Sequence, residues 1–214
     1  MLRNFPSQGL YAITDGPRPD LLAAAAAALR GGTALLQYRD KSGDDAQRRA
    51  EAEALLGLCR QHDVPLIIND DVELAAHIGA DGVHLGQSDA AIASARQRLG
   101  ADAIIGASCY ASLDRARQLA AAGATYLAFG AFFPSATKPH AQRASPDLLR
   151  EARVLALPLV AIGGITPDNA LPLLAAGADF IAVVSGVFGA PDPESAAGRY
   201  SELFTISPMD HDAH

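Results

Sequence analysis

Tryptophan, cysteine and basic residues are scarce in this sequence. It has no tryptophan and only two cysteines, Cys59 and Cys109, among 214 residues. Two cysteines are too few for a disulfide scaffold, so we expect reduced thiols in a cytoplasmic protein. The 24 acidic residues outnumber the 17 Lys and Arg residues and leave a net charge of −7. Because general nucleic-acid binding needs a basic face, we expect no nucleic-acid partner, although a small basic pocket is compatible with this charge.

Long apolar runs are also missing. A membrane-spanning helix needs roughly 20 apolar residues, and the longest such stretch, residues 21–29, is shorter and mostly alanine. The first six residues show no apolar core of a secretory leader, so we expect neither a leader nor a membrane partner. Residues 207–214 are polar and without periodicity, which predicts a disordered tail.

The apolar content is that of a folded protein with a substantial core. Apolar residues make up 50% of the chain and charged residues 19%, which excludes a disordered chain. A single α/β barrel commonly takes roughly 200–250 residues. We therefore expect one domain over residues 1–206.

A short pattern occurs four times and marks four strands. In each copy a glycine ends an alanine- and leucine-rich helical stretch, and an apolar run begins about two residues later. The copies recur at intervals of about 48, 44 and 54 positions. They begin Gly31-Gly32-Thr33, Gly79-Ala80-Asp81, Gly123-Ala124-Thr125 and Gly177-Ala178-Asp179.

A second set of apolar runs lies between these copies, at residues 10–14, 66–69, 103–108 and 159–163. Together the two sets predict eight strands. A helical pattern follows each strand, near residues 20–30, 44–61, 71–78, 90–99, 111–122, 145–155, 167–176 and 194–204. Strict alternation predicts a parallel sheet, and eight units predict a (β/α)₈ TIM barrel. The alternative, a doubly wound open sheet, is disfavoured because no Gly-x-Gly-x-x-Gly follows the first strand.

Unusual polar residues follow the predicted strands, at the barrel end where active sites form. The second strand ends with Gln37 and Arg39, which share one face because side chains alternate along a strand, and Lys41 shares this face if the strand continues. The other strand ends supply Asn69, Asp70, His84, Asp89, Ser108, Ser135, Thr137, Lys138, Gly164 and Ser185.

Two glycine-rich strand ends predict a phosphate site. Gly163 and Gly164 let backbone approach a ligand closely, Thr166 is placed to cap the next helix, and the N–H groups of that turn favour an anion. Ser185 adds a hydroxyl after the last strand. The alternative is an ordinary glycine-rich turn before a capped helix.

Asp70 and Asp89 end successive strand units and predict a Mg²⁺ site, because this ion takes one or two carboxylates together with substrate phosphate oxygens. The alternative for each is a helix N-cap. Arg39, Lys41 and Lys138 predict a diphosphate grip, against the alternative of solvated loop charges. His84 is compatible with either a structural or a catalytic role.

Taken in order, these strand ends resemble the thiamine-phosphate synthase family from about residue 9 to residue 188. The matching segments are Gln37-Tyr38-Arg39-Asp40-Lys41, Ile68-Asn69-Asp70, Gly79-Ala80-Asp81-Gly82-Val83-His84-Leu85-Gly86-Gln87, Asp89, Ser108, Pro134-Ser135-Ala136-Thr137-Lys138, Gly163-Gly164-Ile165 and Val184-Ser185-Gly186. The glycine-rich segment occurs in many phosphate-binding barrels, whereas the Gln-x-Arg-x-Lys, Asn-Asp and Thr-Lys set is specific.

The resemblance implies a transferase of thiamine biosynthesis. It would join 4-amino-5-hydroxymethyl-2-methylpyrimidine diphosphate to hydroxyethylthiazole phosphate by a dissociative, carbocation mechanism, giving thiamine monophosphate and pyrophosphate. The implied pyrimidine diphosphate set is Gln37, Arg39, Lys41, Asn69, Ser108 and Lys138, of which Arg39, Ser108 and Lys138 are catalytic. The implied thiazole phosphate set is Ser135, Thr137, Gly164, Val184 and Ser185. Tyr38, Asp40 and Ala136 complete the substrate-binding residues, and Asp70 and Asp89 would hold Mg²⁺.

Two positions depart from the family pattern. Ser135 replaces a frequent threonine and keeps the hydroxyl, whereas Pro139 replaces a frequent second lysine and removes a cation. Two alternative functions are a thiazole tautomerase with a related barrel and a catalytically silent barrel that binds phosphorylated ligands. Neither needs the complete diphosphate and metal set. The sequence leaves the oligomeric state open, a homo-oligomer included.

Overall fold

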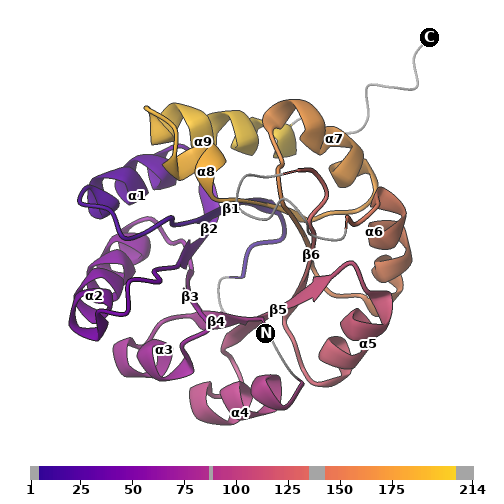
Figure 1. Cartoon of the computed structure of the whole chain (residues 1–214), viewed down its shortest axis with the longest axis horizontal. Helices are drawn as coiled ribbons and strands as arrows, with labels where there is room; N and C mark the ends of the chain where they lie inside the picture. Colours follow the sequence, from indigo (N-terminus) through magenta and orange to yellow (C-terminus); the bar gives the residue numbers. More distant parts are fainter. Residues whose placement is uncertain (1–4, 87–88, 135–142, 206–214) are drawn as a thin grey trace.

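The strands close into one barrel. The computed structural model describes residues 5–86, 89–134 and 143–205, without the side chains of residues 89 and 90. Eight parallel strands pair in chain order and the last pairs with the first, which confirms the predicted (β/α)₈ TIM barrel (Figure 1). They are β1 (Gly9–Ile13), β2 (Thr33–Tyr38), β3 (Leu66–Asn69), β4 (Gly82–Leu85), β5 (Ile104–Tyr110), β6 (Tyr126–Phe129), β7 (Leu159–Ile162) and β8 (Phe180–Val183).

Helices surround this ring on the outside (Figure 1). They are α1 (Leu21–Arg30), α2 (Asp45–Gln61), α3 (Val72–Ile78), α4 (Asp89–Leu99), α5 (Leu113–Ala121), α6 (Pro146–Ala152), α7 (Pro167–Ala175), α8 (Ser185–Phe188) and α9 (Pro193–Ser201), with 3₁₀ turns at Arg153–Leu155 and Glu202–Phe204. The eight predicted helices are confirmed. The sequence did not predict α8, because four residues are too few to show a helical period. The predicted tail, residues 207–214, lies outside the described residues.

The repeated sequence pattern is a hydrogen-bond clamp at the start of the strands. In one copy the Asp81 N–H donates to the Leu66 carbonyl (3.1 Å), and the Leu66 N–H donates to the Asp81 carboxylate (2.8 Å). Asp179 makes the same two bonds with Leu159, each of 2.8 Å. In the third copy the Thr125 hydroxyl accepts from the backbone of β5 at 3.0 Å. In these three copies the side chain of the third residue therefore ties an even-numbered strand to the odd-numbered strand before it, whereas in the first copy the Thr33 hydroxyl donates to the Ala28 carbonyl of α1 at 2.8 Å.

The glycines of the pattern do not all act alike. Gly79 ends α3 in the left-handed conformation, with φ of 67°, as predicted. Gly31 instead has φ of −71°, and Gly32 is the left-handed residue. A side chain at Gly31 would place its Cβ 2.4 Å from the Glu194 carbonyl oxygen. This first glycine is therefore required by the close approach of α9.

The core has two layers. Outward-facing strand residues pack against the helices, and a separate inner cluster fills the ring, with Tyr11, Tyr126 and Phe180 among its large side chains. Phe5 packs against this inner cluster, with its ring centroid 5.9 Å from that of Tyr126 and 5.5 Å from that of Phe180. The ring interior is thus filled from its N-terminal end upward, and space for a ligand is left at the other end. None of the described helices combines the length and apolar character needed to cross a bilayer.

Candidate active site

A cavity of about 280 Å³ opens at the carboxyl ends of the strands. Every strand contributes to its wall, because the strand ends of a closed barrel converge there. Seven of the predicted site residues line it, namely Gln37, Arg39, Asn69, Ser108, Gly164, Val184 and Ser185. These residues come from points as far apart as β2 and β8, and the barrel closure brings them to one rim.

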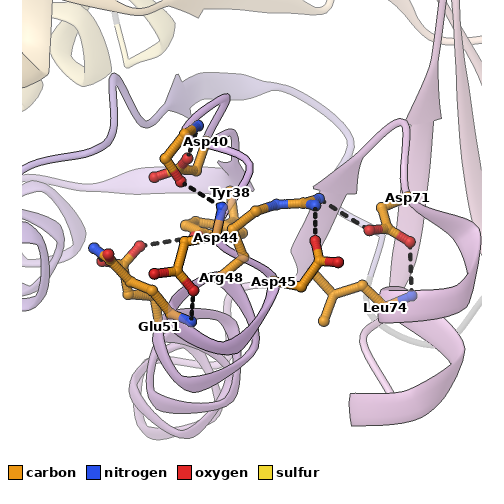
Figure 2. A network of polar contacts seen from close by, with 10 residues as sticks. Tyr38, Asp40, Asp44, Asp45, Arg48, Glu51, Asp71 and Leu74 are labelled. Atoms are coloured by element: carbon orange, nitrogen blue, oxygen red, sulfur yellow. Dashed lines mark hydrogen bonds and ion pairs between the residues drawn. The ribbon is translucent and has the colours of Figure 1, made fainter.

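The alternation along β2 sends Tyr38 and Asp40 away from the cavity. The Tyr38 hydroxyl donates to Glu51 on α2 at 2.7 Å, and an Asp40 carboxylate oxygen accepts from the Ser42 N–H (Figure 2). Neither side chain lines the cavity. Lys41 lies exposed beyond the strand end. On this strand, therefore, Gln37 and Arg39 face the cavity, and the residue between them anchors the strand to α2.

Several predicted residues lie outside the described part of the chain. Ser135, Ala136, Thr137, Lys138 and Pro139 fall within residues 135–142. Helix α4 begins at Asp89, whose side chain is also outside the description. Their predicted roles stay predictions.

Arg39 presents to the cavity a cation that has no partner in the described part of the chain. Its backbone is fixed by Thr14, whose hydroxyl accepts from the Arg39 N–H (2.8 Å) and donates to the Arg39 carbonyl (3.1 Å). Among the described residues its guanidinium has no hydrogen bond and no carboxylate partner. An unpaired guanidinium in a cavity wall is suited to a phosphate, which it grips with two parallel N–H groups.

Asp70 is free of the helix-capping role that was the alternative for it. The cap of α3 is its neighbour Asp71, which accepts from the Leu74 N–H at 2.9 Å. Asp70 itself has φ of 61° and an exposed side chain, and it accepts from the Asn69 amide at 2.8 Å. In the described part of the chain no group of three or more His, Cys, Asp or Glu residues is placed to hold a metal.

The β7 turn only partly matches the predicted phosphate site. Gly164 lines the cavity. A Cβ there would lie 2.4 Å from the Pro134 carbonyl oxygen, so glycine is needed for the close approach of the backbone at Pro134. Thr166 caps α7 as predicted. Its N–H, however, donates to the Asn169 side chain at 2.8 Å. This one N–H is therefore not free for an anion, and the phosphate site predicted from the other N–H groups of the turn stays a prediction.

A tyrosine of α9 contacts the backbone of the turns that follow β7 and β8. The buried Tyr200 hydroxyl donates to the Ile165 carbonyl at 3.0 Å. The same oxygen would lie 2.5 Å from a Cβ at Gly186, so only glycine fits beside it. Sequence reasoning missed Tyr200, since its position on α9 follows the ordinary helical period.

The cavity floor holds a continuous chain of polar side chains that the sequence reasoning missed in part. The Gln37 amide nitrogen donates to the Tyr11 hydroxyl (2.6 Å), and the hydroxyls of Tyr11 and Tyr126 are 2.7 Å apart. His84 Nδ1 lies 3.0 Å from the Tyr126 hydroxyl, and its Nε2 lies 2.9 Å from Ser108 Oγ. His84 thus lines the cavity and has a partner at both ring nitrogens.

Burial sets the charge state of this chain. It lowers the pKa of His84 to about 4, although the nearby Asp70 carboxylate opposes the shift. It also raises the pKa of the Tyr11 and Tyr126 phenols far above the usual value. Near neutral pH all three groups are therefore uncharged. The packing of the Tyr126 ring against β5 has one sign in the sequence, the glycine at position 106 within that strand. A Cβ at Gly106 would lie 1.9 Å from the Tyr126 ring.

Arg115 on α5 holds the backbone of two strand ends. Its guanidinium donates to the carbonyls of Ser108 (2.8 Å) and Gly86 (3.2 Å), and it lies over the Tyr110 ring at 5.4 Å. It therefore fixes Ser108 from outside the barrel. Nothing in the local pattern around Arg115 distinguishes it from a solvated helix residue.

The chain is similar to known proteins over almost its whole length. A family model for thiamine monophosphate synthase matches residues 10–187. The thiamine-phosphate synthase of Thiobacillus denitrificans is 56% identical over 211 residues, which covers 97% of this chain and 99% of that protein. The thiamine-phosphate synthase of Nitrosococcus oceani is 57% identical over 201 residues, which covers 92% and 93%.

A solved structure agrees with these relatives. The thiamine phosphate pyrophosphorylase from Pyrococcus furiosus has a TM-score of 0.84 at 34% identity and covers 96% of this chain and 98% of its own. The resemblance predicted from the strand ends is thereby confirmed. The chain belongs to the thiamine monophosphate synthase family and is an enzyme of thiamine biosynthesis, a transferase whose condensation gives thiamine monophosphate.

Proposed function

We propose that the enzyme joins 4-amino-5-hydroxymethyl-2-methylpyrimidine diphosphate to hydroxyethylthiazole phosphate and releases pyrophosphate. The observation that carries this proposal is the Arg39 guanidinium, which has no partner among the residues that the structure describes and shares one cavity with Ser108, Gly164 and Ser185. Such a cavity offers donors to two phosphorylated groups at different points of its wall. Gln37, Arg39, Lys41, Asn69, Ser108 and Lys138 would hold the pyrimidine diphosphate. Ser135, Thr137, Gly164, Val184 and Ser185 would hold the thiazole phosphate, and Ala136 would belong to the substrate-binding residues between them.

The reaction proposed is dissociative. The bond between the pyrimidine methylene carbon and the diphosphate oxygen breaks first, and its electron pair leaves with pyrophosphate. The lone pair of the thiazole nitrogen then forms the new bond to the methylene cation. Arg39 and Lys138 stabilise the negative charge that grows on the leaving group, and this stabilisation is larger in the transition state than before it. Holding both substrates in line lowers the barrier further.

This route asks for no general base and no protein nucleophile. His84 is uncharged, and both of its ring nitrogens are engaged by Tyr126 and Ser108. Both cysteine side chains are buried, and burial raises the pKa of the Cys109 thiol to about 12. The described groups of the wall therefore suit charge stabilisation and orientation.

Asp70 and Asp89 would hold Mg²⁺. Asp70 fits this role because its carboxylate is exposed at the rim beside Asn69 and is not used as a helix cap. Two carboxylates are a usual protein share for this ion, whose remaining ligands are water and phosphate oxygens. When bound, Mg²⁺ supplies charge neutralisation to a diphosphate.

Tyr38 and Asp40 are assigned an indirect share in substrate binding. Tyr38 ties β2 to Glu51, and a buried Asp40 fixes the turn after the strand through the Ser42 N–H (Figure 2). These contacts hold the backbone on which Gln37 and Arg39 stand.

We further propose that residues 1–206 form one catalytic domain and that the enzyme acts in the cytoplasm.

A reaction assay tests the function. Purified enzyme is mixed with both substrates and Mg²⁺, and thiamine monophosphate and pyrophosphate are quantified. We expect both products in equal amounts, with formation abolished by a chelator and restored by added Mg²⁺. Absence of product would contradict the function. Product formation that a chelator leaves unchanged would contradict the metal assignment alone. Isomerisation of a thiazole substrate without coupling would instead identify a tautomerase.

Two neighbouring aspartates provide a matched pair for the metal site. Asp70→Asn and Asp71→Asn each remove one charge at adjacent positions, but only Asp70 is free of the cap. We expect Asp70→Asn to lower kcat/KM by at least roughly 10-fold, which corresponds to about 1.4 kcal/mol, with an unchanged melting temperature. Asp71→Asn should keep the activity. Equal activity losses in the two variants would refute the assignment of Asp70.

A further inference from the structure

The hydrogen bonds of the polar chain in the cavity floor all run in one donor-to-acceptor direction, which starts at Gln37. The Gln37 amide turns its nitrogen toward Tyr11, and this nitrogen can only donate, so the Tyr11 oxygen accepts. Tyr11 has one proton left to place. Its side chain is 1% exposed, and among the described residues the Tyr126 oxygen is its remaining partner. Tyr11 therefore donates to Tyr126, because the opposite direction would leave a buried phenol proton without an acceptor.

The direction passes through His84. Since the Tyr126 oxygen accepts from Tyr11, its own proton goes to Nδ1 of His84, 3.0 Å away. A neutral imidazole has one donor and one acceptor nitrogen, so the ring proton is on Nε2. That N–H donates to Ser108 Oγ at 2.9 Å. Each acceptor in the chain is thereby filled by the donor before it.

We propose that Tyr11, Tyr126 and His84 are positioning residues that leave the Ser108 hydroxyl proton free to point into the cavity. Ser108 Oγ accepts from His84, so the Ser108 hydroxyl proton is not used in the hydrogen bond with the imidazole. A hydroxyl that donates is what a diphosphate needs, whereas a hydroxyl that donates to the imidazole would face the anion with lone pairs only. This inference rests on the proposed function of Ser108 in diphosphate binding.

The packing around Tyr126 keeps the chain in register. Its ring stacks against Phe5 and against His84, with centroid separations of 5.9 Å and 5.6 Å and interplanar angles of 14° and 22°. The Tyr11 ring meets it edge-on at 5.8 Å. Gly106 leaves the space that the ring occupies. These three ring contacts hold the phenol oxygen in place.

The first test reads the direction without any catalysis. We use the intact free enzyme with ¹⁵N-labelled histidine and record the ring nitrogen shifts of His84 near pH 7.5, assigned by comparison with His84→Gln. The inference requires the neutral tautomer protonated at Nε2. A tautomer protonated at Nδ1 would overturn it, since Ser108 would then donate to the ring. Because this readout needs no substrate, it is independent of the proposed reaction.

The second test is a double-mutant cycle between Tyr126 and Ser108, measured with both substrates and Mg²⁺. Tyr126→Phe removes one oxygen and keeps the ring stack. We expect it to lower kcat roughly 10-fold in the wild-type background, with a smaller change in KM for the pyrimidine diphosphate. In the Ser108→Ala background the same change should alter kcat less than about 2-fold, because Tyr126 acts through Ser108. Equal losses in both backgrounds would overturn the inference.

A second variant keeps the cycle decisive. If Tyr126→Phe does not fold, as judged by circular dichroism and thermal unfolding, His84→Leu is measured in the same two backgrounds. It removes both hydrogen-bonding atoms next to Ser108, and the same non-additivity is expected. An inactive wild-type enzyme would contradict the proposed function, while the tautomer measurement would still decide the direction of the chain.

Discussion

Acidification should destabilise the enzyme through His84. Burial lowers the pKa of this imidazole to about 4 in the folded state, against 6.5 for the ordinary side chain. Between these values the unfolded chain binds a proton at this position and the folded chain does not. The free energy of unfolding should therefore fall as the pH falls from 6.5 to about 4. Above this window the stabilising contribution of the uncharged His84 should be fully present.

The size of the effect follows from the shift. Each pKa unit corresponds to about 1.4 kcal/mol, so the lowering from 6.5 to about 4 gives at most about 3 kcal/mol. The ring borders a cavity that water enters, and solvent contact reduces this value. Within the window the slope is at most about 1.4 kcal/mol per pH unit, which is a large fraction of the stability of a typical domain.

Urea unfolding at a series of pH values between 4 and 8 measures this slope. Other groups titrate in the same range, so the informative quantity is the difference between the wild type and His84→Gln. Glutamine does not titrate, yet it can accept from Tyr126 and donate to Ser108. We expect the wild type to lose stability more steeply than the variant as the pH falls. Parallel curves across the window would refute the idea that His84 is held uncharged by burial.

Three further predictions concern the scaffold of the site, each checked by chemical unfolding. Asp179→Ala should cost about 1–3 kcal/mol because the first N–H of β7 loses its acceptor, whereas Asp179→Asn should retain most of this stability. Gly106→Ala should prevent folding or cost more than about 3 kcal/mol, since its Cβ would overlap the Tyr126 ring; a stability near that of the wild type would contradict the packing. Tyr200→Phe should cost about 1 kcal/mol and raise KM for the thiazole phosphate, because Ile165 loses its anchor; an unchanged KM would separate this tyrosine from the site.

The barrel itself was predictable from the sequence. Buried parallel strands are continuous apolar runs, and the glycine-led pattern before every second strand separates them from the helices. Asp81 and Asp179 give the pattern a physical basis, since each clamps its strand to the preceding one. Such signals can be recognised in a single sequence because each one depends on residues of one strand–helix repeat and not on distant parts of the chain.

The side-chain directions on β2 were only partly predictable. Alternation correctly put Gln37 and Arg39 on one face, and the same rule puts Tyr38 and Asp40 on the other. Matching residues to a family by sequence does not distinguish a side chain that lines a cavity from one that holds the strand behind it. A structure makes this distinction directly.

Contacts between distant segments were not predictable. Tyr11 and Tyr126 are 115 positions apart and meet only because the barrel closes. Thr166 illustrates the same limit on a local scale, because its N–H donates to the Asn169 side-chain oxygen, a bond that the sequence pattern did not predict. Long-range register and the detailed use of each N–H group are set by tertiary packing, which no periodicity records.

Phe5 beneath Tyr126 has a consequence for traffic through the molecule. In the described part of the chain the ring interior behind the floor is filled, so the cavity is closed toward the N-terminal end of the barrel and opens at the carboxyl ends of the strands. Both reactants must enter, and both products must depart, through the same opening. Whichever molecule sits deeper has to wait until the shallower one has gone, so the architecture itself imposes an order on release.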